Sequence, residues 1–185
     1  MVYIRGNKSD YDKWSALGCK GWSYDEVLPV FKKLENNNAG GNSKYHGFDG
    51  ELSVVSPQDA NDAGKRFVSA GSVIGLSQNP DFNAESQIGL GIYNVTQSNG
   101  TRVSSYTAFL EPVLSRSNLT ILTKTSVSAL DIQGEKVSAI NISTDGFDRK
   151  IIFNKEVIIC AGAIDSPRLL LASGIGDKKE LQDLG

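Results

Sequence analysis

The stretch at residues 159–177, ICAGAIDSPRLLLASGIGD, decides how this sequence is interpreted. It begins inside the apolar run VIIC at residues 157–160, which is expected to be a strand covered on both faces, as in a parallel sheet. The run leads through residues 161–163 (AGA) into a leucine-rich helix. That helix is expected to end at residues 174–176 (GIG), where glycine allows a left-handed cap. The pattern therefore predicts a strand–turn–helix unit.

The small residues of this turn have two interpretations. A helix that begins directly after a central strand presents free N–H groups and partial positive charge, so a pyrophosphate or ribose edge fits beside Gly162. Alternatively, the small residues only allow the strand and the helix to pack closely. Cys160 is expected to be a small buried residue and not a nucleophile, because no histidine lies near it in the sequence.

Short segments rich in β-branched residues precede this unit and predict a run of antiparallel strands. The expected strands are residues 119–124, 126–132, 136–143, 149–154 and 156–160. One more strand is expected at residues 51–55. The helical spacing of apolar residues predicts helices nearer the N-terminus. The expected helices are residues 21–35, 60–75 and 102–116.

Two details of these elements are specific enough to test. Ser23 stands at an N-cap position with Glu26 three residues later, while Pro29 inside the pattern predicts a kink or a later start. In the next helix, Phe67 and Val73 belong to the face expected to pack inward. Between these helices, residues 36–43 (NNNAGGNS) are expected to be a mobile loop, because they carry almost no apolar surface.

Composition excludes several classes of function. A chain of 185 residues with 39% hydrophobic residues is expected to form one domain or parts of two. A net charge of −2 gives no basic surface for nucleic acid, and no apolar run approaches the roughly 20 residues of a membrane span. Two cysteines and one histidine predict no metal site. The first residues have no leader character, which leaves the cytosol as the default compartment.

Residues 162–176, from Gly-Ala-Ile-Asp-Ser-Pro to Ser-Gly-Ile-Gly, resemble the second signature of the glucose-methanol-choline (GMC) family of flavin-dependent oxidoreductases. Other segments resemble the same family in the same order. These are residues 1–6 (MVYIRG), 10–14 (DYDKW), 21–22 (GW), 28–35, 46–47 (HG), 50–54 (GELSV), 100–110 and 118–119. The resemblance therefore spans essentially the whole chain.

The resemblance implies an α/β to α+β fold that combines part of a Rossmann-like FAD-binding domain, including a β-meander, with part of an antiparallel-sheet substrate domain. Residues 1–50 are expected to belong to the FAD domain and residues 51–117 to the substrate domain. Residues 118–185 would return to the FAD domain with strands, meander and strand–turn–helix unit. The implied cofactor is FAD, and the implied reaction is hydride transfer from a small alcohol to the flavin, of the choline dehydrogenase or alcohol oxidase kind.

The family's pattern also assigns individual residues. Val127 is expected to contact the adenine end of FAD through its backbone, with Ala161 and Gly162 near the same nucleotide. No residue is assigned to catalysis. The family's catalytic histidine belongs to a region that would follow Gly185, and His46 matches a different element and is expected at the surface or in a turn.

The family's Gly-x-Gly-x-x-Gly and first signature are expected to precede the segment with which this chain begins. The chain alone is therefore expected to be inactive. The alternative is a non-catalytic truncated or split-chain module that self-associates or binds a complementary polypeptide, because an unpaired sheet edge recruits other chains.

Overall fold

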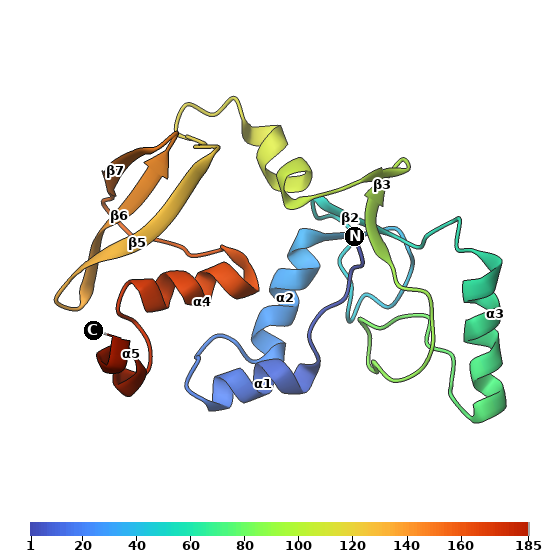
Figure 1. Ribbon diagram of the computed structural model, residues 1–185. Helices are drawn as coiled ribbons and strands as arrows, with labels where there is room; N and C mark the ends of the chain where they lie inside the picture. Colours follow the sequence, from blue (N-terminus) through green and yellow to red (C-terminus); the bar gives the residue numbers. More distant parts are fainter. Residues whose placement is uncertain (185) are drawn as a thin grey trace. The chain divides into compact units, whose positions relative to one another are not determined.

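The computed structural model describes residues 1–184 and divides the chain into two compact units (Figure 1). Unit 1 is Met1–Leu119, and unit 2 is Thr120–Gly185, described to residue 184. Each unit has its own sheet, one mixed and one antiparallel. The expected α/β to α+β class is confirmed at this level.

Unit 1 contains short helices and a four-stranded sheet in the order β1-β2-β3-β4. Its regular elements are α1 (Lys8–Ala16), α2 (Tyr24–Leu34), β1 (Glu35–Asn37), β2 (Leu52–Val55), α3 (Asp62–Ala70), β3 (Val95–Ser98) and β4 (Thr101–Arg102). Three single turns of helix complete it, η1 (Gly71–Ile74), η2 (Tyr106–Leu110) and η3 (Glu111–Val113). Strand β1 pairs with β2 in parallel, and the other pairs are antiparallel.

The capped helix predicted for this unit is present. Ser23 is the N-cap of α2, and its backbone N–H donates to Glu26 Oε2 at 3.0 Å. The helix begins at Tyr24 and continues through Pro29, so the later start is wrong. Its buried face joins α1 in an apolar cluster of Tyr11, Tyr24 and Val27 with Leu28 and Phe31.

Three expectations for unit 1 need correction. Residues 36–43 form a loop only from residue 38 onward, because residues 36 and 37 belong to β1, which pairs with β2 and leaves Asn37 only 5% exposed. Phe67 and Val73 are 70% and 85% exposed, whereas Val68 is half-buried, so the apolar face of α3 and η1 is only partly covered within residues 1–184. The helix expected at residues 102–116 is reduced to the π-helical turn η2 and the 3₁₀ turn η3, which contains Pro112.

Unit 2 is a three-stranded antiparallel meander with helices beside it. Its elements are β5 (Thr125–Gln133), β6 (Lys136–Thr144), β7 (Phe147–Ile152), α4 (Gly162–Ala172) and α5 (Lys178–Leu184). Asp145 and Gly146 both have positive φ, at 51° and 82°, as in the tight turns that suit the twist of a hairpin. Leu130, Ala139 and Ile142 from the sheet are buried, as is Leu169 from α4.

The meander strands at residues 126–132, 136–143 and 149–154 are confirmed within a few residues. The strands expected at residues 119–124 and 156–160 are wrong, because neither segment is a strand. Ile158 is 75% exposed and Cys160 is exposed rather than buried. A central strand needs hydrogen-bonded neighbour strands and cover on both faces, and residues 1–184 pair no strand with this segment.

The helices formed by residues 1–184 all lack the length and apolarity needed to cross a bilayer.

Candidate functional site

The turn singled out in the sequence lies at the start of α4 in unit 2. Gly162, the first residue of this helix, has φ of 88°, a left-handed conformation that a Cβ strongly disfavours. No atom of the described chain lies within 4 Å of the position that a Cβ at residue 162 would take. Glycine is therefore needed at residue 162 because of the backbone conformation. Close packing of a strand against the helix is not the reason.

The first turn of α4 offers polar groups of the backbone. The N-cap residue is Ala161, which has no side chain able to accept from the helix, and its own N–H donates to Ser166 Oγ at 3.1 Å. N–H groups at the start of a helix carry partial positive charge and bind anions or hydroxyl oxygens. The open space beside Gly162 leaves room for such a group.

A cavity of about 480 Å³ lies between this turn and the meander. Its wall includes Val127 and Leu130 from β5, Ile140 from β6, residues 157–161, and Leu169 from α4. Most of these side chains are apolar, so the cavity suits a flat apolar ring. Two charged side chains, Asp165 and Arg168, lie at the same wall and pair with each other, with Arg168 Nε 2.7 Å from Asp165 Oδ1.

Helix α4 is fixed against the sheet by packing and by one polar link. Leu169 and Leu130 are both buried where α4 meets β5. Ser173, at the C-cap of α4, accepts from the backbone N–H of Leu130 at 2.8 Å and donates to Leu169 O at 2.6 Å. The cavity is therefore bounded by elements whose relative positions are set within unit 2.

Two of the three residues proposed from the sequence come together at this cavity. Val127 and Ala161 are 34 residues apart in sequence and line the same wall. Gly162 follows Ala161 directly and is not part of the lining itself. The contributions of Ile140 and Arg168 were missed. Strand alternation on the meander could have indicated Ile140, whereas no sequence signal placed Arg168 there.

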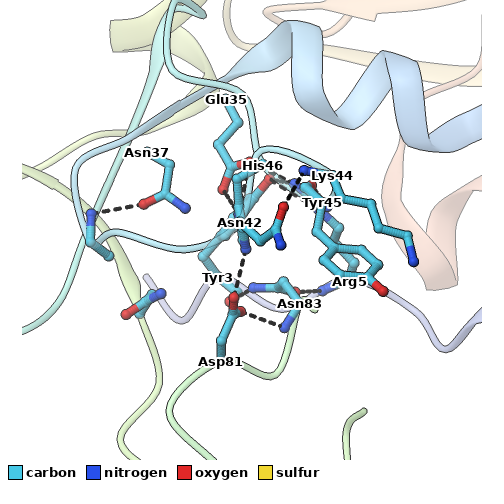
Figure 2. A network of polar contacts seen from close by, with 12 residues as sticks. Tyr3, Arg5, Glu35, Asn37, Asn42, Lys44, Tyr45, His46, Asp81 and Asn83 are labelled. Carbon is cyan, nitrogen blue, oxygen red and sulfur yellow. Dashed lines mark hydrogen bonds and ion pairs between the residues drawn. The ribbon is translucent and has the colours of Figure 1, made fainter. Parts of the chain in front are cut away.

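The single histidine is not at this cavity, and the expected surface position is wrong. His46 belongs to unit 1 and is 1% exposed. Its Nδ1 lies 3.0 Å from Glu35 Oε1, and its Nε2 lies 2.8 Å from Asp81 Oδ2 (Figure 2). Burial lowers the pKa of His46, but the hydrogen bonds and charges of the two carboxylates outweigh it and leave the pKa raised.

Arg5, left without a role by the sequence, completes this buried cluster. Its Nη2 lies 2.6 Å from Glu35 Oε2, and its Nη1 donates to the carbonyl oxygen of Tyr45 at 2.7 Å. Within residues 1–184, no three His, Cys, Asp or Glu side chains are grouped closely enough to hold a metal ion.

Comparison with protein families gives one match over the whole chain. The model described as GMC oxidoreductase matches residues 1–185. Among curated relatives, an alcohol dehydrogenase [acceptor] from Pseudomonas putida is 39% identical over 187 residues, and an oxygen-dependent choline dehydrogenase from Sinorhizobium fredii is 37% identical over 185. Each alignment covers 100% of this chain, but only 34% and 33% of the relative.

Solved structures give the same result for the fold. Pyridoxine 4-oxidase from Mesorbium loti superposes with a TM-score of 0.85 at 34% identity, covering 98% of this chain and 36% of the other. An FAD-dependent oxidoreductase from Chaetomium thermophilum gives 0.87 at 28% identity, covering 100% and 34%. The chain thus spans about a third of the length of the proteins it matches, and its fold is that of part of these flavoenzymes.

Proposed function

Because this chain belongs to the GMC oxidoreductase family, we propose that its unit 2 holds the adenine end of FAD in an enzyme that oxidises the CH–OH group of an alcohol. The observation that carries the proposal is the meeting of Val127 and Ala161 at one apolar cavity, beside the turn at Gly162. The family match and the flavin named in a solved relative support the choice of cofactor.

The residues present fit a dinucleotide. The apolar wall formed by Val127, Ile140 and Leu169 suits the face of a purine. The first turn of α4 provides backbone N–H groups for ribose or phosphate oxygens, and Gly162 leaves the space beside them open. Arg168 lies at the same wall, where its pairing with Asp165 leaves no net charge, so the N–H groups of α4 are the groups that favour an anionic oxygen.

In this proposal the chain contributes binding and orientation. Bound FAD would supply the acceptor for a hydride from the alcohol carbon, which amino acid side chains cannot provide. We assign His46 no part in removing the hydroxyl proton, because both of its ring nitrogens face carboxylates in a buried cluster. We therefore expect the chain alone to bind the nucleotide without turning over an alcohol.

A second candidate is a non-catalytic module that pairs with a complementary polypeptide or with itself. It is favoured by residues 157–160, which are apolar and pair with no strand within residues 1–184, with Ile158 75% exposed. Backbone groups of such a segment accept another strand readily.

The test of the first candidate is a titration of FAD with the purified chain, in which binding is measured by the quenching of flavin fluorescence. Displacement should succeed with ADP, which contains the adenine end, and fail with FMN, which lacks it. Ala161→Leu should weaken binding at least about tenfold by filling the cavity, a change of about 1.4 kcal/mol. Ala163→Leu is the matched control, because Ala163 is exposed and lies outside the lining.

Equal competition by FMN and ADP would refute the placement of the adenine end, as would unchanged affinity in Ala161→Leu. The second candidate predicts a different outcome. The chain would then remain free of flavin alone and would elute in gel filtration as an oligomer, or gain flavin only after a second polypeptide is added.

A further inference from the structure

The ring of His46 lies between two carboxylates that come from distant parts of unit 1. Glu35 is the C-cap of α2 and begins β1, whereas Asp81 belongs to the turn of residues 79–83 (Figure 2). Water has little access to the ring, because Gly41 closes over it. A Cβ at residue 41 would lie 2.8 Å from His46 Cδ2 and 3.3 Å from Asp81 Oδ2.

This arrangement requires a protonated ring. A neutral imidazole has one N–H donor and one acceptor, whereas an ionised carboxylate can only accept. Glu35 faces Nδ1 and Asp81 faces Nε2, so both nitrogens must donate. The imidazolium satisfies both carboxylates, and the neutral ring would leave a lone pair facing one of them.

The surrounding charges decide which contact fails when the proton is lost. The Glu35 carboxylate also accepts from Arg5 Nη2 and from the Gly47 N–H, and its side chain is fully buried. Asp81 has a 20% exposed side chain, and it also accepts from the N–H of Asn83 in its own turn. The neutral ring should therefore keep Nδ1–H on Glu35 and release Asp81, which water can solvate.

One more titratable group faces the cluster. The Tyr3 hydroxyl lies 3.4 Å from Arg5 Nε. Burial raises the pKa of Tyr3, with Arg5 opposing the shift, so this hydroxyl stays protonated while His46 titrates. His46 is thus the group in this cluster that changes charge as the pH rises through its raised pKa, while Tyr3 stays protonated.

The turn that carries Asp81 also forms one side of a second cavity. This cavity, of about 410 Å³, is lined by Phe82 and Asn83 from that turn, and by residues 84, 85 and 87 that follow it. Tyr24 and Tyr45 also line this cavity. A change at Asp81 therefore alters the wall of this cavity.

We propose that His46 is a pH-dependent latch. Its imidazolium fastens Asp81 to the buried core of unit 1. Loss of its proton releases that contact and loosens the turn at one wall of the cavity, while Asn83 and Gln87 keep their hydrogen bonds to the backbone of Tyr3 and Arg5.

The chain has one histidine, so its ring can be followed by NMR without ambiguity. In the 185-residue chain labelled with ¹⁵N, both ring nitrogens should show imidazolium shifts at pH 6.5. On raising the pH, the Nε2 signal should move to the value of an unprotonated nitrogen while Nδ1 keeps its proton. Amide exchange of residues 81–87, corrected for the intrinsic effect of pH, should rise at least about tenfold in the same interval.

Asp81→Asn is the decisive variant, because it keeps the shape of the side chain and removes the charge. It should lower the apparent pKa of His46 and remove the step in exchange at residues 81–87. His46→Gln should abolish the step as well. Lys65 and Asp62 form an exposed pair in the same unit, so Asp62→Asn is the control and should change neither reading.

A neutral ring at pH 6.5 in the wild-type chain would overturn the proposal. A step in exchange that survives in Asp81→Asn, or exchange at residues 81–87 that ignores the titration of His46, would do the same.

Discussion

The buried carboxylate of Glu35 offers the sharpest test of the forces that hold unit 1 together. It accepts from Arg5 Nη2 at 2.6 Å, from His46 Nδ1 at 3.0 Å and from the Gly47 N–H at 3.1 Å, with no exposure to water. Glu35→Gln would leave two buried cations facing a neutral amide whose NH₂ group cannot accept. Removing one partner of a buried ion pair costs about 3–5 kcal/mol, and we expect a loss of that size.

The pH dependence of this loss follows from the raised pKa of His46. A raised folded pKa stabilises the fold below the unfolded value of about 6.5, and this contribution is lost as the pH rises through the folded pKa. Glu35 supplies part of that stabilisation. The loss of stability in Glu35→Gln relative to wild type should therefore be larger at pH 6 than at a pH above the folded pKa of His46, where the ring no longer carries a charge for Glu35 to stabilise.

The assay is urea unfolding, monitored by the fluorescence of Trp14 and Trp22, which both belong to unit 1. Asp25→Asn is the matched control. It makes the same chemical change at the exposed pair of Asp25 with Lys8, whose atoms are 3.5 Å apart, and an exposed pair contributes about 0–1 kcal/mol. If Glu35→Gln costs no more than this control at either pH, the buried cluster does not stabilise the fold as argued.

Two substitutions in unit 2 and one measurement of thiol reactivity provide three further tests. Gly162→Ala should cost about 1–2 kcal/mol through backbone strain at φ of 88°, measured by thermal unfolding, and should weaken FAD binding, whereas no change in either would show that the turn relaxes freely. Leu169→Ala should destabilise unit 2 by about 2–5 kcal/mol and loosen α4 from β5, measured by urea unfolding and amide exchange; a loss under about 1 kcal/mol would contradict its burial. Cys19 and Cys160 should both react with Ellman's reagent without denaturant, because both are exposed; a single reactive thiol in the native chain would contradict this.

Local signals in the sequence were sufficient for several elements. The capped start of α2 depends on Ser23 and Glu26, which are three residues apart. The meander follows from β-branched alternation and from tight turns such as Asp145-Gly146, and each strand pairs with its neighbour in sequence. Such features need no information about distant parts of the chain.

The expectations that failed depend on distant partners. Asn37 is ordered because β1 pairs with β2, a contact that the polar composition of residues 36–43 does not reveal. His46 is buried because Glu35 and Asp81, 11 and 35 residues away, surround it with charge. The strand predicted at residues 156–160 is absent for the opposite reason, because no strand in residues 1–184 pairs with this apolar segment.

The candidate site was predictable in part. The turn at Gly162 was found from composition, and Val127 from the family resemblance, but only the fold brings Val127 and Ala161 to one cavity. The paired charges of Asp165 and Arg168 at its wall depend on the helical spacing of α4, and no motif in the sequence drew attention to them.

The enclosed imidazolium also changes how the whole molecule behaves in an electric field. The formal net charge of −2 counts the single histidine as neutral, so a protonated His46 makes the chain −1 near neutral pH. One charge is half of that total. Electrophoretic mobility toward the anode and retention on an anion exchanger should therefore both rise as the ring loses its proton, by an increment that His46→Gln lacks, although the group responsible is buried.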